Sequence, residues 1–413
     1  MVNLQTEMAG LKFKNPFLAG CAGITATSYV IGKWLKAGAA GFVGKSLTTD
    51  PLLRQTIRPI FYPLNKYGSR GAMTESELLS HLSPKVWFEE EAPAIKQLCK
   101  EHNAVWIQSI VGTGVDRDDW AQLARLVQDA GADAVELDLG CPLAGGESEA
   151  YESIELGEDP VTSAMLIHAV KKAVDIPVGA KLSPTIRRLD KIALACESAG
   201  VDFFSAINAP AGFAIDVEKE EIVGANTFVG YIPGPSHKWW GLWKVAQVAS
   251  ACKVPISGVG GIHKGYDAVE YMLLGCPTFQ VVSALYFQGI KAIPQMLNDI
   301  TKFMEKKGYR EIGDFRGKCL DQLKLYRDVP KENTWDMYPR HTEESAPLTP
   351  RFDVDNCNFC MLCVDTCLVD AIQADKGKRE ITSDPARCYS CGWCAGICPT
   401  DAVELVHART GRV

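Results

Sequence analysis

The chain of 413 residues lacks several features that would assign it to common protein classes. No stretch approaches the ~20 consecutive apolar residues that a transmembrane helix needs. The first residues carry no apolar segment typical of a secretory signal peptide. No G-x-G-x-x-G motif follows a strand-like segment and opens a helix, so we find no nicotinamide or FAD site. We therefore expect a cytoplasmic protein that binds no membrane.

Strong charge of either sign is also lacking. The formal net charge is −7, which disfavours nucleic acid and anionic lipid as partners. Hydrophobic residues make up 47% of the chain and charged residues 23%, as in ordinary globular proteins. A chain of this length is expected to form two domains, one of them with a large core.

Cysteine, in contrast, is abundant near the C-terminus, where two runs share the spacing C-x2-C-x2-C-x3-C. A cubane cluster needs four converging thiolates, and in bacterial-type ferredoxins each run gives its last cysteine to the other run's cluster. We therefore predict two [4Fe–4S] clusters. The ligands of the first are Cys357, Cys360, Cys363 and Cys398. The ligands of the second are Cys388, Cys391, Cys394 and Cys367.

Two other interpretations of these cysteines agree less well with the sequence. A structural zinc site usually presents its cysteines as two pairs, not as triplets with a trailing fourth. A disulfide framework needs an oxidising compartment. The remaining cysteines lie mostly in apolar segments, where a free thiol behaves as a small hydrophobic side chain. Together with oxygen-sensitive clusters, they indicate a reducing environment.

The first 300 residues alternate short apolar segments with longer helical patterns, which predicts an α/β fold, a (β/α)8 TIM barrel. A doubly wound open sheet is the alternative. The expected strands are 16–23, 41–47, 104–111, 134–140, 177–183, 203–208, 255–261 and 278–284. The expected domains are the barrel at 1–300, a helical extension and linker at 301–350, and a ferredoxin-like domain at 351–413.

Two loops are expected to contribute to the barrel's C-terminal mouth. The longest interruption, 48–102, is rich in Pro, Tyr, Arg and Ser and is predicted to wrap over it. On the sixth β–α loop, His237 precedes the aromatic group Trp239, Trp240 and Trp243. These aromatic residues are interpreted either as a stacking wall for a planar ring or as core packing under the rim.

A flavin phosphate site is predicted after the seventh and eighth strands, from Gly260, Gly261 and Ser283. Backbone N–H groups in these loops of TIM barrels often bind phosphate, although a glycine pair also suits a plain tight turn. Lys45 and Lys181 end apolar strands, where a buried ammonium needs an anion. Either lysine can stabilise the anionic reduced flavin, and a buried salt bridge is the alternative.

Taken together, barrel and clusters resemble one family, the FMN- and iron–sulfur-containing subunit of dihydropyrimidine dehydrogenase, which is related to dihydroorotate dehydrogenase. The motifs that carry this resemblance are Asn15-Pro16-Phe17, Gly44-Lys45-Ser46, Glu136 to Pro142, Ala180 to Pro184, Asn208, Gly260-Gly261-Ile262 and Ser283-Ala284. The resemblance implies that FMN is held at Ala19, Gly20, Lys45, Lys181, Gly260, Gly261, Ser283 and Ala284. It also implies reduction of the C5–C6 double bond of uracil or thymine, or the reverse.

The chain departs from the family where the proton donor is expected. A catalytic cysteine of the fourth β–α loop is replaced by Leu156, and Asp138 stands where an asparagine is expected. Leucine cannot move a proton, and a missing acid costs roughly 10²–10⁴-fold in rate. Four side chains of the same loop are candidates to replace this acid. They are Tyr151, Glu152, Ser153 and Glu155. The alternative for each of them is a solvated loop side chain without a catalytic role. The predicted catalytic residues are Asp138, Tyr151, Ser153, Lys181 and Asn208.

The sequence is compatible with three functions. The leading one is an FMN- and iron–sulfur-dependent reductase or dehydrogenase of a pyrimidine. The second keeps the chemistry but acts on another unsaturated carbonyl, thioester or heterocycle. The third is an electron-transfer subunit whose flavin relays electrons to a partner. In each case the resemblance implies an oligomer that includes a FAD/NAD(P)H-binding electron-transfer subunit, or a ferredoxin as donor.

Overall fold

The structure is a computed structural model of the whole chain. It describes residues 2–51, 53–54, 60–65, 70–76, 79–140, 156–224, 230–324 and 348–407. The chain divides into two compact units, Met1–Leu323 and Lys324–Val413.

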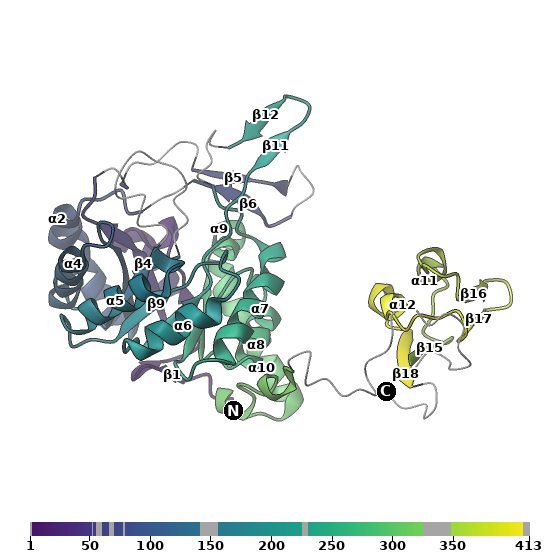
Figure 1. The fold of residues 1–413 in the computed structure, drawn as a ribbon. Helices are drawn as coiled ribbons and strands as arrows, with labels where there is room; N and C mark the ends of the chain where they lie inside the picture. The colour runs from purple at the N-terminus through teal and green to yellow at the C-terminus, as the bar shows by residue number, and fades with distance from the viewer. Residues whose placement is uncertain are drawn as a thin grey trace. The chain divides into compact units, whose positions relative to one another are not determined.

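Eight parallel strands close into a barrel in the first unit (Figure 1). Around the barrel they are β3 (Phe17–Ala19), β4 (Gly41–Thr48), β7 (Val105–Val111), β8 (Ala134–Asp138), β9 (Val178–Lys181), β10 (Phe203–Ala206), β13 (Ile256–Val259) and β14 (Thr278–Val281). Each strand overlaps one of the eight predicted segments. The predicted TIM barrel is therefore confirmed.

Helices cover the outside of the barrel and alternate with its strands. They are α1 (Ser28–Lys36), α2 (Pro84–Val86), α3 (Ala92–His102), α4 (Arg117–Ala130), α5 (Pro160–Lys171), α6 (Leu189–Ser198), α7 (Lys238–Ala249), α8 (Gly265–Leu273), α9 (Ser283–Gln288) and α10 (Ala292–Lys307). In the described ranges, every helix is too short or too polar to cross a membrane.

The local sequence explains both kinds of element. All seven residues of β7 are buried, as expected for a parallel strand covered on both faces. Helix α4 begins where the Asp116 side chain accepts hydrogen bonds from two backbone N–H groups, and it ends at Gly131 with φ +94°. Between these caps, Trp120, Leu123 and Val127 recur at helical spacing and are buried against the barrel.

The two ends of the barrel are closed differently. At the N-terminal end, β1 (Thr6–Met8) and β2 (Leu11–Phe13) form a hairpin whose Met8 and Phe13 pack with Val43 and Phe203 of the barrel strands. The C-terminal end carries two hairpins (Figure 1). The strands of these hairpins are β5 (Phe61–Pro63), β6 (Met73–Glu75), β11 (Ala214–Asp216) and β12 (Glu221–Val223).

The segment 48–102, predicted to wrap over the mouth, does two things in its described parts. Its β5–β6 hairpin lies at the mouth, and Glu75 of β6 forms an isolated bridge with Tyr231, which also bridges to Ala211. Its second half, α2 and α3, covers the side of the barrel, where α3 packs against α1. The segment therefore contributes both a hairpin at the mouth and a helix on the side of the barrel.

The barrel unit extends beyond the expected boundary at residue 300. Helix α10 continues through Lys307 and packs against α8, so residue 300 lies inside a helix. Beyond it, Ile312 and Phe315 are buried in the same hydrophobic core as the barrel helices. Residues 301–323 of the expected extension therefore belong to the barrel unit, which ends at Leu323.

The described part of the second unit contains two antiparallel pairs of strands and two short helices. The strands are β15 (Leu348–Phe352), paired with β18 (Val403–His407), and β16 (Ile372–Asp375), paired with β17 (Glu380–Ser383). The helices are α11 (Leu362–Asp365) and α12 (Trp393–Ile397), which contact each other. Ile372, Val403 and Cys394 form its buried centre.

Candidate active site and cluster domain

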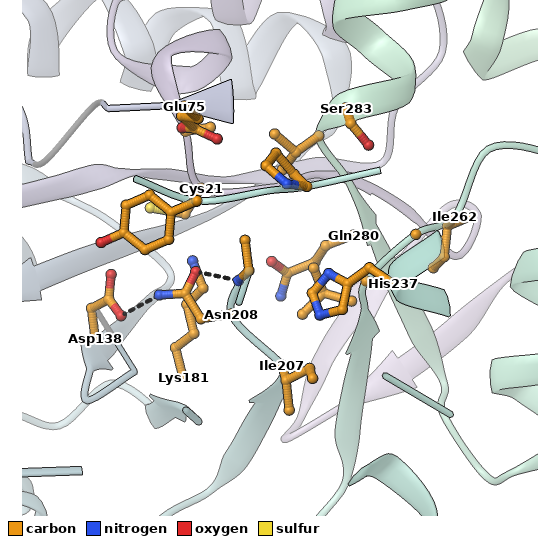
Figure 2. Close-up of a pocket in the computed structure, with 18 of the residues that line it drawn as sticks. Cys21, Glu75, Asp138, Lys181, Ile207, Asn208, His237, Ile262, Gln280 and Ser283 are labelled. Carbon is orange, nitrogen blue, oxygen red and sulfur yellow. Dashed lines mark hydrogen bonds between the residues drawn. The ribbon is translucent and has the colours of Figure 1, made fainter. Parts of the chain in front are cut away.

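A pocket opens at the C-terminal mouth of the barrel, where the ends of the strands meet (Figure 2). It holds about 770 Å³ free of protein atoms, including the part open to solvent. The position is the one at which catalytic residues of TIM barrels gather, because the β–α loops converge there.

Five of the eight residues predicted to hold FMN line this pocket. They are Lys45, Lys181, Gly260, Gly261 and Ser283. The other three do not line it but lie one or two positions along the chain from residues that do. Ala19 ends β3 and is followed by Gly20 and the lining residue Cys21, and Ala284 follows Ser283 in α9.

The two glycines after β13 bring backbone to the pocket surface where a side chain would not fit. Gly261 has φ +65°, and a Cβ there would lie 2.4 Å from the backbone nitrogen of Lys238. Gly260 has φ +130°, which other residues rarely adopt. Beside them, the Ser283 hydroxyl hydrogen-bonds to Nε2 of His263 at 2.8 Å. Burial lowers the pKa of His263 to about 4, so this imidazole is neutral near pH 7.

Lys45 and Lys181 are both only 6% exposed and reach the pocket from β4 and β9. Two buried ammonium groups on one pocket require anionic neighbours or an anionic ligand. Lys181 stabilises the charged form of Glu136, and both lysines favour the thiolate of Cys21. Burial nevertheless raises the pKa of Cys21, so its thiol stays protonated.

Asp138, at the end of β8, is held by three donors. Its Oδ2 accepts a hydrogen bond from the Ser46 hydroxyl at 3.0 Å. Its Oδ1 accepts from the backbone N–H of Gly140 at 3.3 Å and from Nδ2 of Asn208 at 3.4 Å. The same amide also donates to the Gly140 carbonyl at 2.9 Å. Asp138 and Asn208 both line the pocket, so two predicted catalytic residues share one network with Ser46.

Beneath the pocket, a second polar network fills the barrel interior. Ser205 donates a short hydrogen bond to the carboxyl group of Glu136, and Nε2 of Gln280 donates to the Ser205 hydroxyl at 2.7 Å. Complete burial raises the pKa of Glu136 to about 7, although Lys181 and the hydrogen bond from Ser205 oppose the shift. Glu136 is therefore partly protonated at neutral pH.

Two buried polar atoms at the pocket have no hydrogen-bond partner among the described residues. They are Nε2 of His237 and Oε1 of Gln280. Burial lowers the pKa of His237 to about 4, so it is a neutral imidazole. Buried polar groups are rarely left unpaired in native proteins, so these atoms indicate a ligand that supplies partners.

The aromatic group next to His237 matches neither interpretation given to it. Trp239, Trp240 and Trp243 are 67%, 45% and 45% exposed, so they form no core under the rim. They are also absent from the described lining of this pocket, so they form no stacking wall in it. Instead, the buried side chain of Lys244 in α7 lies over the rings of Trp240 and Trp243. His237 alone reaches the pocket.

Among the polar residues that line the pocket, sequence reasoning did not select four. They are Cys21, Glu75, Tyr231 and Gln280. Gln280 was detectable as a polar residue inside an otherwise apolar strand, and Cys21 as the residue after the predicted FMN contacts. Glu75 and Tyr231 come from separate insertions that meet through backbone bridges. No local sequence signal reveals such a meeting.

The fourth β–α loop is only partly described. The predicted Tyr151 and Ser153, the candidates Glu152 and Glu155, and Cys141 all lie outside the described residues. Leu156, where the family's catalytic cysteine was expected, is 4% exposed and belongs to the hydrophobic core. Gly157 fixes this end of the loop, because a Cβ there would lie 1.8 Å from the Leu139 carbonyl oxygen.

The pocket fits FMN on two observations. Two buried lysines can neutralise a phosphate or the flavin edge, and Gly260 and Gly261 turn the backbone at the pocket surface with positive φ. The unpartnered atoms of His237 and Gln280 add hydrogen-bonding capacity for a polar ring system. Lys45, Lys181, Gly260, Gly261 and Ser283 are the residues that would hold it.

In the second unit, the cysteines gather around two small cavities. Cys357, Cys360, Cys363 and Cys398 line one of them. Cys367, Cys388, Cys391 and Cys394 line the other, together with Cys363. Each cavity thus combines three cysteines of one run with the last cysteine of the other run, which is the arrangement predicted from the spacing.

Comparison with known proteins matches both units. Residues 3–304 match the dihydroorotate dehydrogenase family, and residues 335–402 match a 4Fe-4S dicluster domain. The chain is 31% identical to the catalytic subunit of dihydroorotate dehydrogenase B (NAD(+)) of Methanocaldococcus jannaschii, over 74% of this chain and 94% of that protein. It is 30% identical to the Pyrococcus abyssi protein of the same description, over 77% of this chain and 99% of that one.

A third relative covers the cluster domain as well. The NAD-dependent dihydropyrimidine dehydrogenase subunit PreA of Escherichia coli K12 is 27% identical over 98% of this chain and 96% of its own length. The family binds FMN, and the dicluster domain indicates two [4Fe–4S] clusters. The chain belongs to the dihydroorotate dehydrogenase family and is an FMN- and iron–sulfur-dependent oxidoreductase that acts on CH–CH groups.

Proposed function

We propose that the chain reduces the C5–C6 double bond of a pyrimidine, or runs the reverse reaction, at the mouth of its barrel. The observation that carries this proposal is the pair formed by Asp138 and Asn208 at the pocket. A carboxylate and an amide, held 3.4 Å apart by fixed partners, present hydrogen-bonding groups to the edge of a planar ring. The similarity to a dihydropyrimidine dehydrogenase subunit over 98% of the chain supports the same substrate class.

In this proposal, different residues of the chain bind the cofactor, orient the substrate and supply the proton. Lys45 and Lys181 bind the cofactor and offset its negative charge. Asn208 and Asp138 orient the ring. Bound FMN supplies two-electron transfer to or from the carbon–carbon bond, and the clusters supply single electrons. A proton must still reach the second carbon, and for this we propose Tyr151 or Ser153 of the fourth β–α loop.

The partner and compartment form part of the same proposal. We place the chain in the cytoplasm, as a subunit of an oligomer that receives electrons from a FAD/NAD(P)H-binding subunit or a ferredoxin. None of the fourteen cysteines of the described residues forms a disulfide, as expected where thiols are kept reduced. The Escherichia coli relative is itself described as a subunit of an NAD-dependent enzyme.

One observation favours a second candidate, a different unsaturated carbonyl, thioester or heterocyclic substrate. Leu156 is buried in the core and not in the described lining of the pocket, so the position expected for the family's acid cannot serve any substrate. A changed proton donor is compatible with a changed substrate. Both candidates keep the pocket, the cofactor and the cluster domain.

Anaerobic turnover separates the candidates. The reduced holoenzyme is mixed with uracil or thymine, flavin absorbance is followed, and the product is identified by mass spectrometry. The proposal predicts flavin reoxidation at a catalytic rate and a product heavier by two hydrogens. If no pyrimidine is reduced but other enoyl or heterocyclic compounds are, the second candidate is correct. If only a co-purifying protein reoxidises the flavin, the chain is an electron relay and both candidates fail.

A further inference from the structure

A chain of buried hydroxyl groups leads from the interior of the barrel to the pocket. The hydroxyls of Ser109 and Ser46 lie 3.0 Å apart, and both residues are buried. Ser46 donates its hydrogen to Oδ2 of Asp138, which lines the pocket (Figure 2). Because a hydroxyl has only one hydrogen, the hydrogen between the two serines belongs to Ser109. Both hydrogen bonds therefore run toward the pocket.

The inner end of this chain is Glu136 of β8, which is 0% exposed. Glu136 and Ser109 are registered neighbours on β8 and β7, and the Ser109 hydroxyl favours the charged form of the carboxyl group. Ser109 can therefore turn its hydrogen toward an ionised Glu136, or accept a hydrogen from a protonated one. Every hydroxyl of the chain both donates and accepts, which is what the transfer of a proton along it requires.

The polar network around Glu136 has more acceptors than donors. Oε1 of Glu136 and Oε1 of Gln280 are buried and have no partner among the described residues. Ser205 joins the two side chains through their other polar atoms. A proton on Glu136 adds an O–H donor to this network, and buried acceptors are rarely left without one. Complete burial favours the same form, since it raises the pKa of Glu136 to about 7.

The ionised form of Glu136 is also supported. Lys181 of β9 and the hydrogen bond from Ser205 stabilise its negative charge, whereas Asp138 opposes it. The thiol of Cys21, which follows β3, is in turn affected by the charge of Glu136. Within the described residues, these are the ionisable groups that act on Glu136 or respond to it. With both forms supported, the carboxyl group can release a proton and bind it again near neutral pH.

The electron supply makes such a group useful. A hydride consists of two electrons and one proton, whereas iron–sulfur clusters pass single electrons without protons. For every hydride that leaves bound FMN, one proton must therefore reach the pocket separately. A store inside the protein can supply it while bound molecules keep water out of the pocket. This proton is additional to the one that Tyr151 or Ser153 would give to the substrate.

We propose that Glu136 stores this proton and passes it along the two serine hydroxyls to Asp138 at the pocket wall. The O–H bond of Glu136 breaks as Ser109 gains a hydrogen. Ser109 passes its own hydrogen to Ser46, which passes its own to Asp138. Asp138 releases the proton into the pocket toward the cofactor, and after product release Glu136 regains a proton from water along the reverse path. The proposal rests on the FMN and cluster assignment and not on a pyrimidine as substrate.

A pH jump on the oxidised holoenzyme tests the path without any turnover. Raising the pH from about 5.5 to about 8.5 should ionise Glu136, and stopped-flow infrared spectroscopy follows the loss of its carboxylic acid band. Glu136→Gln should lack this band, which assigns the signal. Ser109→Ala should show the band but lose it at least about 10-fold more slowly, because the path lacks one hydrogen bond.

Three further variants separate the path from packing. Ser109→Thr restores a hydroxyl and should recover the parent rate. Ser109→Cys keeps a side chain of similar size but donates only weakly, so it should also be slow, and it replaces the alanine variant if that does not fold. Thr278→Val is the matched control, because the buried Thr278 hydroxyl donates to Ser257 and lies off the path. FMN content shows that each variant is folded.

Turnover gives the functional consequence. The protonated form of Glu136 delivers the proton, so kcat of the parent should fall as pH rises through about 7. Ser109→Ala should lower kcat at least about 10-fold and leave KM unchanged, because the lining of the pocket is intact. Glu136→Gln should lower kcat and lose this pH dependence, which a merely structural role would not remove.

Two results would overturn the proposal. One is ionisation at the parent rate in Ser109→Ala, and the other is the pH profile of the parent in Glu136→Gln. The outcomes also separate the proton store from the proposed function. If ionisation follows the path but no pyrimidine is reduced, the proton store is correctly assigned and the substrate is not. If pyrimidines are reduced and both variants behave as the parent does, the substrate is correct and Glu136 stores no proton.

Discussion

Ser46 and Asp138 lie 92 residues apart on different barrel strands, and the Ser46 hydroxyl donates a 3.0 Å hydrogen bond to Oδ2 of Asp138. The same hydroxyl lies 3.0 Å from that of Ser109 and 3.3 Å from Sγ of Cys21. Ser46 therefore fixes the orientation of the carboxylate that we place against the substrate. Positioning of this kind affects ring binding and leaves cofactor binding intact.

Ser46→Ala should weaken binding of the pyrimidine about 10-fold, because Asp138 loses one of its fixed donors. FMN content should stay at the parent level. Ser109→Ala is the matched control, since Ser109 contacts Ser46 but is not among the described residues that donate to Asp138. Difference spectra on both variants give the comparison. Equal weakening by the two substitutions would show that Ser46 acts only through packing.

Lys181→Met should strongly reduce FMN retention, because a buried cation that lines the pocket, and that we propose binds the cofactor, is lost. We expect a rise in the FMN dissociation constant of roughly 10-fold or more. The flavin-to-protein ratio after gel filtration measures it. Lys36→Met, on the exposed face of α1, removes a lysine far from the pocket and should retain FMN fully. Full retention in Lys181→Met would place the cofactor elsewhere.

Gly261→Ala should abolish FMN binding, since the new Cβ would lie 2.4 Å from the Lys238 backbone nitrogen at a φ of +65°. The control is Gly308→Ala, which has φ +75° but no atom within 4 Å of the new Cβ. Both variants carry the backbone strain of about 1 kcal/mol, and only the first adds a steric clash at the pocket. The FMN content of the two variants distinguishes the steric clash from backbone strain. Equal losses of FMN would mean that backbone strain alone is responsible.

Cross-ligation predicts which cysteines act together. Cys357→Ser and Cys398→Ser should damage one cluster, and Cys388→Ser and Cys367→Ser the other. Each variant should retain about four of the roughly eight irons. Iron analysis and electron paramagnetic resonance give the count and the identity of the surviving cluster. If Cys357→Ser destroyed one cluster and Cys398→Ser left that cluster intact, each run would ligate its own cluster. Cys319→Ser, in the barrel unit, is the control.

Glu136 makes stability depend on pH. Its pKa is about 7 in the folded protein against an ordinary value of 4.5, so between these values the folded state holds a proton that the unfolded state has released. The free energy of unfolding therefore falls by about 3 kcal/mol as pH rises through this window. Glu136→Gln has no titrating group at this position and does not lose this stability. The difference between its urea midpoint and that of the parent should therefore increase as pH rises from about 5 to about 8. A constant difference would contradict the shift.

The fold was predictable because its signals are local. Each barrel strand is a short buried segment such as 105–111, and each helix, such as α4, carries its own caps. The cysteine spacing was equally informative, because two cavities bring together the cysteines that the spacing pairs. Lys45, Lys181, Gly260, Gly261 and Ser283 were found by their places at the ends of strands.

The rest of the site depends on contacts between distant segments. Glu75 reaches the pocket because its backbone bridges to Tyr231, more than 150 residues later. Trp240 is exposed on α7 and lies outside the pocket, although the nearby His237 lines the pocket. The catalytic roles predicted for Tyr151 and Ser153 stay predictions, because both lie outside the described residues.

The most direct test counts product per chain in a single reduction. The holoenzyme is fully reduced without air, freed of donor, and mixed with an excess of the pyrimidine that turns over fastest. Two electrons on the flavin and one on each cluster should yield about two molecules of dihydropyrimidine per chain. That result is expected if the clusters feed the barrel flavin and the flavin reduces the substrate. One molecule or none per chain would contradict the account.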